Sequence, residues 1–220
     1  MLRILVPSGR PRHPNGKVGG QIVIIPLPWK NAVANAKADN SGLGGVFTLE
    51  LKTSKGRLII INNYWPTKPQ ADTDSSNALW NKYKRWLKKT GSGLSPIDYL
   101  RDTLEKLLDK HTDKGDPVIA LGDFNAHWNS PGATYNDLSD WVSDCGLKNE
   151  IGVLSQEHSV ALETFIRGDV PSQIDHILTN VSDKIVLSGF GCATGAVWQI
   201  FKDHVPIWAQ YKIAGGGSPN

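Results

Sequence analysis

The stretch PVIALGDFN at Pro117–Asn125 decides which fold and which chemistry to expect of this 220-residue chain. Its apolar first half is typical of a buried strand, and its second half presents a carboxylate and an amide two residues apart. Side chains at positions i and i+2 point the same way if the extended conformation continues, so we expect Asp123 and Asn125 to face one site. A carboxylate can hold a hard cation or accept a proton, and an amide can donate a hydrogen bond without adding charge. Asp and Asn after a strand are also ordinary turn formers, so this motif alone is weak.

Two further acids stand nearer the C-terminus. Asp175 lies in an isoleucine-flanked stretch with strand character, where an unpaired charge would be costly to bury. It therefore requires a partner, and we propose His204, because a carboxylate can fix the tautomer and orientation of an imidazole. Asp203 is a candidate metal ligand or water-orienting base, although a lone Asp-His pair is more often polar surface.

Short runs rich in β-branched residues predict strands, with a few helical patterns between them. Ser95 before a proline, and the leucines that follow, predict a helix that is N-capped by Ser95 and ends near His111. An apolar stripe from Leu138 predicts a helix capped by Gly146, and a third helix is expected over Ser76–Lys88. Strands joined with few helices between them favour antiparallel or mixed sheets with helices packed outside. The predicted strands are Gln21–Pro26, Val46–Leu51, Leu58–Asn63, Val118–Leu121, Ile174–Thr179, Lys184–Ser188 and Pro206–Ile213.

The composition, with 40% hydrophobic residues, suits one domain with a sizeable core. No run approaches the ~18 apolar residues of a membrane helix, and the apolar start is too short for a signal peptide. Cys145 and Cys192 are interpreted as free thiols. The net charge of +3 conceals an asymmetry, because residues 1–110 hold 18 Lys+Arg against 8 Asp+Glu while residues 111–220 hold 6 against 13. This division would suit a protein that acts on nucleic acid, although halves of a sequence need not form separate faces.

A cluster of basic residues falls within the third expected helix, interleaved with Trp80, Tyr83 and Trp86. The cluster could grip a nucleic-acid backbone. Alternatively the helix is amphipathic, with its aromatic residues in the core and its lysines in solvent. The core is favoured for the aromatic residues, and both interpretations stay open for the lysines. The basic residues are Lys82, Lys84, Arg85, Lys88 and Lys89.

Taken in order, the three acid-bearing motifs resemble the endonuclease/exonuclease/phosphatase superfamily, whose members carry GD-(F/L)-N, then ID-(H/Y)-I, then SDH-x-P-I. The stretch NYWP at residues 63–66 is similar to a strand end of the family in which a tyrosine lies close to the scissile phosphate. The pair TF at residues 164–165 and the stretch DFNAHW at residues 123–128 are similar to the endonuclease domains of LINE-type retrotransposons. The likeness covers most of residues 16–213, and Lys202 departs from the usual serine.

The resemblance implies a role for each of five residues. Asp123 would activate or position the attacking water, and Asn125 would orient the phosphate. His204, held by Asp175, would stabilise charge on the phosphorane, and Tyr64 would contact the phosphate.

The resemblance also implies a fold, a cofactor and partners. The fold is α/β (α+β), a four-layered sandwich of two mixed sheets face to face with helices on both outer faces. Asp123, Asn125 and Asp203 would hold a divalent metal, and their oxygen-type side chains suit Mg²⁺ or Mn²⁺ rather than structural Zn²⁺. The implied substrate is DNA, with RNA as a second candidate, in a parent element that is fused to a reverse transcriptase.

One departure from the family bears on activity. Family domains open with an Asn-bearing strand, a helix and a strand ending in Gln-Glu, whose Glu is a principal metal ligand. Here Gly19–Ile24 is similar to the next strand, so we expect an N-terminally truncated domain over residues 1–213 with a flexible tail at 214–220. Prolines in Met1–Asn15 are expected to discourage regular pairing there. Gln156-Glu157 mimics the missing dipeptide but is interpreted as a solvated loop.

Three functions stay open on the sequence alone. The leading hypothesis is a metal-dependent phosphodiester hydrolase of retroelement type that nicks DNA. The alternatives are a phosphatase of the same superfamily acting on a small or lipid phosphoester, and a catalytically inactive retroelement-derived fragment.

Overall fold

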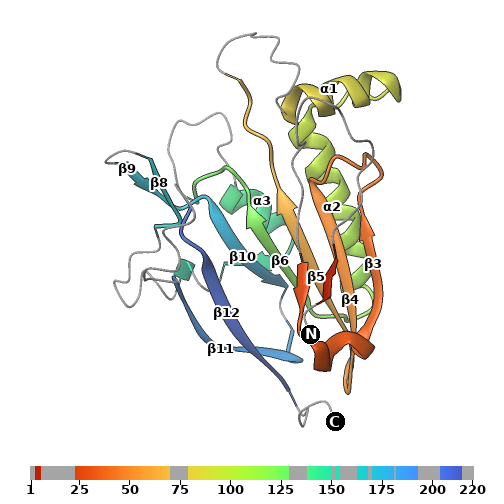
Figure 1. Cartoon of the computed structure of the whole chain (residues 1–220), viewed down its shortest axis with the longest axis vertical. Coiled ribbons are helices and arrows are strands. Elements are labelled where there is room, and N and C mark those ends of the chain that lie inside the picture. The colour runs from red at the N-terminus through yellow and green to blue at the C-terminus, as the bar shows by residue number, and fades with distance from the viewer. Residues whose placement is uncertain are drawn as a thin grey trace.

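In the computed structural model, the described residues form four β-sheets and three α-helices (Figure 1). The described residues are 3–5, 23–69, 79–128, 138–149, 152–153, 163–167, 170–180, 182–192 and 204–214. Asp203 and the Gln156-Glu157 pair lie outside them.

The largest sheet has six strands in the order β3-β4-β5-β6-β10-β7. Strands β5 and β6 run parallel, and every other neighbouring pair is antiparallel. A parallel pair needs a crossover connection, and here α1 and α2 lie in it. The strands are β3 (Val33–Ala38), β4 (Val46–Thr53), β5 (Gly56–Tyr64), β6 (Val118–Asp123), β10 (Asp175–Asn180) and β7 (Leu147–Lys148).

Three helices pack on one face of this sheet: α1 (Leu79–Lys89), α2 (Pro96–Thr112) and α3 (Leu138–Asp144). Helix α2 begins as expected, because the Ser95 side chain accepts a hydrogen bond from the Asp98 backbone N–H. Its buried stripe of leucines meets apolar side chains of β4, β5 and β6. In the part of the chain that the structure describes, no helix is long and apolar enough to span a membrane.

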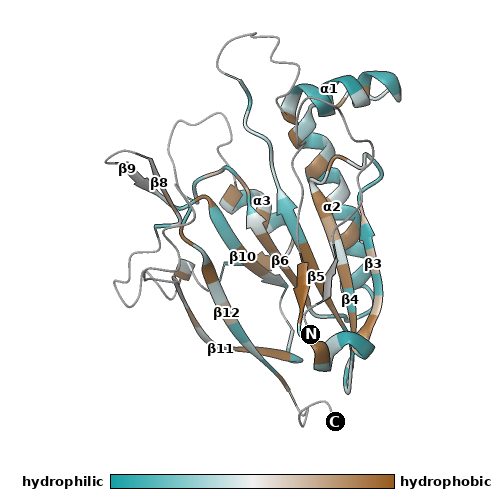
Figure 2. Ribbon diagram, in the orientation of Figure 1, coloured by the Kyte–Doolittle hydropathy of each residue, from teal (hydrophilic) through white to brown (hydrophobic). Residues whose placement is uncertain are grey.

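A second apolar core lies on the other face of the sheet. There the two-stranded pairs β11 (Ile185–Cys192) with β12 (Ile207–Ile213), and β1 (Arg3–Leu5) with β2 (Val23–Ile25), lie over the six-stranded sheet (Figure 1). Figure 2 shows hydrophobic residues along β11 and the central strands, whereas most of α1 is hydrophilic. The helices, the large sheet and the smaller sheets thus form successive layers.

The expected fold class is confirmed: the chain is a mixed α/β structure with sheets facing each other. Among the described residues the α-helices cover only one outer face, so the expected four layers, with helices on both outer faces, are seen in part. One expectation about the N-terminal part was wrong, and one strand there was missed. Arg3–Leu5 pairs antiparallel with β2 despite the nearby prolines, and β3 was not predicted because its sequence, VANAKA, is short of large apolar residues. The remaining short elements are the 3₁₀ helix η1 (Leu27–Ala32), β8 (Phe165–Arg167) and β9 (Val170–Ser172).

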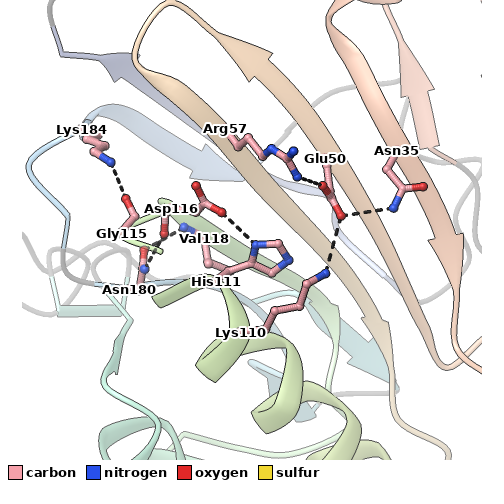
Figure 3. Close-up of polar contacts among 10 residues, drawn as sticks. All are labelled: Asn35, Glu50, Arg57, Lys110, His111, Gly115, Asp116, Val118, Asn180 and Lys184. Carbon is pink, nitrogen blue, oxygen red and sulfur yellow. Dashed lines mark hydrogen bonds and ion pairs between the residues drawn. The ribbon is translucent and has the colours of Figure 1, made fainter. Parts of the chain in front are cut away.

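A buried polar network holds one end of β6 against β10 (Figure 3). Asn180 accepts a hydrogen bond from the Val118 N–H at 2.8 Å and donates one to the Asp116 carbonyl at 3.0 Å. The fully buried His111 of α2 lies 3.0 Å, Nδ1 to Oδ2, from the Asp116 carboxylate. Since a one-residue slip would break these contacts, the network fixes the register of the two strands and hence the pairing at their opposite ends.

Candidate functional site

The sequence-predicted residues meet where β5 and β6 end and β10 begins, at the upper end of the sheet in Figure 1. In the sheet, Asp123 lies opposite Tyr64 on one side and opposite Asp175 on the other. Both neighbouring strands therefore deliver a polar side chain to the position where Asp123 stands.

His204 lies 3.0 Å from Asp175, measured from Nδ1 to Oδ2, as the sequence argument requires. Its side chain is 34% exposed and that of Asp175 is 19% exposed, so the pair is partly shielded and still reachable. A bridge to Phe165, whose ring packs edge-on at 4.9 Å, holds the histidine in place. Because Nδ1 faces a carboxylate, it carries a proton, and Nε2 is the atom presented to a substrate.

Thr164 is fully buried and forms hydrogen bonds next to both members of this pair, a role we call the hub. Its Oγ1 accepts hydrogen bonds from the N–H groups of Ile174, at 3.1 Å, and Asp175, at 3.0 Å. Its carbonyl accepts from the N–H of Val205, next to His204, at 2.7 Å. One residue therefore positions both members of the pair.

Burial raises the pKa of Asp175, and hydrogen bonds from Thr164 and His204 together with the charge of His204 oppose that rise. These two neighbours thus favour the ionised form of the carboxylate against the effect of burial. Loss of either neighbour would favour the protonated form, which accepts hydrogen bonds less well.

The two carboxylate oxygens of Asp123 face different groups, one in the backbone and one in the site. Oδ1 accepts a hydrogen bond from the Asn125 N–H at 2.9 Å, and Oδ2 lies 4.0 Å from Nε2 of His204. That separation is too long for a hydrogen bond but short enough for a strong electrostatic interaction with a cationic imidazole.

Asn125 reaches the site by a turn and not by continued strand, which corrects the expected extended geometry. Its φ is +48°, in the left-handed region that asparagine tolerates better than most residues. Its Nδ2 donates to the carbonyl of the buried Trp65 at 2.6 Å. The side chain is thereby oriented, while its second N–H and its Oδ1 remain as groups for a ligand.

Gly122 is required by the same turn. Its φ is +135°, and a Cβ at this position would overlap the backbone of Asn63 on the neighbouring strand. Only glycine allows β5 to approach so closely just before Asp123.

Tyr64 lies beside Asp123 on the adjacent strand. Burial, and secondarily the Asp123 carboxylate, raise the pKa of its hydroxyl above the ordinary 10.0. The hydroxyl therefore stays protonated at neutral pH and can donate a hydrogen bond to an anion.

A divalent cation fits part of this donor set. Ligand atoms of Asp123, Asp175 and His204 all lie within 4.8 Å of one another. Of the predicted ligands, Asp123 belongs to this grouping, which adds Asp175 and His204. Asn125 and Asp203 stay predicted ligands, and Asp203 lies outside the described residues. Because Asp175 is already bonded to His204, we regard Asp123 as the principal anchor, and carboxylate oxygens are what Mg²⁺ prefers.

His176 is a supporting residue that the sequence did not assign. It is 1% exposed, and burial lowers its pKa to about 4, so the ring is neutral and Nε2 donates to the Ala126 carbonyl at 2.9 Å. This bond holds the loop that follows Asn125. Trp128 packs near the same ring, at 6.0 Å, as part of the loop.

Comparisons with known proteins identify a family and several similar folds. A family model described as endonuclease-reverse transcriptase matches residues 59–208, whereas no curated protein matches the chain. Among solved structures, humanized D. rerio TDP2 has a TM-score of 0.54 at 12% identity, covering 96% of this chain and 76% of its own. The 3′ phosphatase NExo from Neisseria, bound to a product DNA hairpin, has a TM-score of 0.47 at 18% identity over 77% of this chain. The Xenopus laevis APE2 catalytic domain has a TM-score of 0.47 at 16% identity, also over 77% of this chain. The chain spans 65% of NExo and 55% of that APE2 domain.

Proposed function

Because this chain belongs to the endonuclease-reverse transcriptase family of the endonuclease/exonuclease/phosphatase superfamily, we propose that it is a divalent-metal-dependent phosphodiester hydrolase that nicks DNA, of the kind found in retroelements. The observation that carries the proposal is the 3.0 Å pairing of His204 with Asp175 at a strand end that also bears Asp123. The family description supports an endonuclease, and the reverse transcriptase in that description supports the retroelement origin. We propose residues 1–213 as the domain.

The chemistry follows from the charge of the substrate. A phosphodiester is anionic and repels nucleophiles, so hydrolysis requires positive charge at the non-bridging oxygens and a positioned water. In this proposal His204 donates from Nε2 to a non-bridging oxygen, while Asp175 holds the ring. Tyr64 and Asn125 donate further hydrogen bonds to the phosphate. Asp123 accepts a proton of the attacking water as the water oxygen bonds to phosphorus. The ester P–O bond on the opposite side breaks, and the leaving alkoxide takes a proton from solvent.

The proposed cofactor is Mg²⁺ or Mn²⁺, held by Asp123 with help from Asp175 and, by resemblance, Asp203. Bound there, it would neutralise charge on the phosphate and acidify water. The resemblance alone supports Asp203, which lies outside the described residues.

The test is nicking of supercoiled plasmid by the full chain. We expect nicking with Mg²⁺, none with EDTA, and recovery when Mg²⁺ is restored. His204→Ala should abolish it, although the variant still unfolds cooperatively, at a somewhat lower midpoint because Asp175 loses its partner. Undiminished nicking in EDTA would contradict metal dependence. Release of inorganic phosphate from a 3′-phosphorylated oligonucleotide without nicking would favour the phosphatase alternative, and no hydrolysis of either substrate would favour the inactive fragment.

A further inference from the structure

Helix α1 has a charge pattern unlike that of its neighbour α2. Its sequence, LWNKYKRWLKK, contains five basic residues and no acidic residue. In α2, by contrast, Lys106 lies 2.7 Å from Asp102, one turn earlier, and Lys110 lies 3.9 Å from Glu50 of β4. Among the residues that the structure describes, none forms an ion pair with the lysines of α1.

The helix does not gain its stability from these charges. Lys84 and Lys88 stand four residues apart, a spacing at which like charges repel. An 11-residue helix is also marginal by itself, so packing must hold it. Tyr83 and Leu87 supply that packing, with 0% and 2% of their surfaces exposed, and the Trp86 ring lies 5.0 Å from that of Tyr99.

The buried side chains leave the opposite side of α1 to solvent. Lys84, Arg85, Lys88 and Lys89 are exposed there, while Lys82 is half-buried at its margin. These five residues form what we call the basic face of α1. With a rise of about 1.5 Å per residue and about 3.4 Å per phosphate of one strand, the helix spans roughly five phosphates.

A short chain of hydrogen bonds connects α1 to the candidate site. The Tyr83 hydroxyl accepts from the N–H of Gly45 at 2.8 Å, and the Gly45 carbonyl accepts from the N–H of Tyr64, also at 2.8 Å. Figure 1 likewise shows α1 at the end of the molecule where β5 and β6 terminate. These bonds fix the buried side of α1 beside the strand that carries Tyr64, so a duplex that extends past the site over this helix would meet its solvent-exposed basic face.

We propose that the basic face of α1 binds the phosphate backbone of duplex DNA beside the scissile bond. The inference rests on the proposed function for its substrate. Lysine ammonium groups contact phosphates as point charges, so the face strengthens binding and sets orientation without selecting a sequence.

The experiment compares the wild-type chain with two triple variants of equal charge change. The test variant is Lys84→Gln, Lys88→Gln and Lys89→Gln. The control variant is Lys30→Gln, Lys52→Gln and Lys55→Gln. Their exposed side chains belong to η1, to the end of β4 and to the β4–β5 turn, at the other end of the sheet. Glutamine has nearly the helix propensity of lysine, so unfolding midpoints should stay equal.

Binding to a labelled duplex is measured by fluorescence anisotropy between roughly 50 and 200 mM salt. Each phosphate contact contributes about 0.9 to the slope of log affinity against log salt, so the test variant should lose about 2.7 and bind roughly 100-fold more weakly near 0.15 M salt. Hydrolysis of bis(p-nitrophenyl) phosphate should not change in either variant, because this small diester does not extend to α1. The control variant should keep the wild-type slope.

The outcomes separate this inference from the proposed function. If the wild type nicks DNA and the test variant keeps its affinity and slope, the inference is overturned and the function stands. Equal losses of duplex affinity in both triple variants would mean that only net charge matters, and would also overturn the inference. A test variant that loses affinity for single-stranded RNA but keeps its affinity for duplex DNA would overturn it too. If the test variant has a lower unfolding midpoint than the wild type, a second variant that keeps the charge is measured, with Lys84→Arg, Lys88→Arg and Lys89→Arg. This variant should keep the wild-type slope of log affinity against log salt, and a lower slope would overturn the inference. A wild type that hydrolyses neither DNA nor the small diester contradicts the proposed function. In that case the duplex-binding measurements alone decide whether the basic face binds DNA.

Discussion

Thr164→Val tests the hub beneath the Asp175–His204 pair. The substitution keeps the shape of the side chain but removes the Oγ1 that accepts hydrogen bonds from the N–H groups of Ile174 and Asp175. The first of these bonds is buried and the second is partly buried. An unsatisfied buried donor costs about 1–3 kcal/mol, so we expect the free energy of unfolding to fall by about 3 kcal/mol in total.

The same change should reduce activity by loosening Asp175. The carboxylate loses its hydrogen bond to the Thr164 hydroxyl, which opposes the rise that burial causes in its pKa. His204 is then oriented less firmly, and we expect nicking to slow at least tenfold, a modest part of the ~10²–10⁴-fold contribution of a positioned acid–base group.

Urea unfolding and single-turnover nicking measure the two effects, with Thr164→Ser as the matched control. Serine keeps the hydroxyl and loses one methyl group, so it should cost about 1 kcal/mol and little activity. If the valine and serine variants prove equally stable and equally active, the hydroxyl does not hold the pair, and the argument fails.

Two other substitutions test the six-stranded sheet that positions the site. Glu50→Gln removes the carboxylate that lies 2.8 Å from Arg57 (Figure 3). Burial raises the pKa of Glu50, but the hydrogen bond from Asn35 and the nearby cations outweigh burial and hold that pKa below the ordinary 4.5. The ionised Glu50 should therefore contribute about 1 kcal/mol to the free energy of unfolding above pH ~4.5, and this contribution should disappear as the pH falls further. The urea midpoints of the wild type and the variant should then converge in acid. A difference between the midpoints that widens in acid would contradict this sign. Gly122→Ala should cost about 3 kcal/mol because its Cβ meets the neighbouring backbone, whereas Gly42→Ala, at φ +65° in open space, should cost about 1 kcal/mol, and equal losses in thermal unfolding would exclude the clash.

The sequence predicted the parts of the fold that hydrophobic pattern and capping determine. Helix α2 followed from Ser95 and its leucine period, and the central strands followed from β-branched runs that the core buries. Strand β3 was not predicted, because four of its six residues are exposed and Val33, its first, is its only large apolar residue. An edge strand of that composition is defined by its hydrogen-bonded neighbour, which a local pattern does not contain.

The candidate site was predictable to the extent that its residues had to find partners. An acid among isoleucines required a counterpart, which is why the pairing of Asp175 with His204 could be proposed. The hub role of Thr164 and the left-handed turn at Asn125 could not, because both depend on backbone groups brought together across distant segments. His111 likewise meets Asp116 only through the turn that ends α2.

A double-mutant cycle on Asp175 and His204 tests the central claim most directly. Single-turnover nicking rates are measured with saturating Mg²⁺ for the wild type, Asp175→Asn, His204→Ala and the double variant. If the carboxylate acts through the imidazole, each single change costs orders of magnitude, and the double variant is little slower than the worse single. Losses that multiply in the double variant would show that the two residues act independently and would contradict the account.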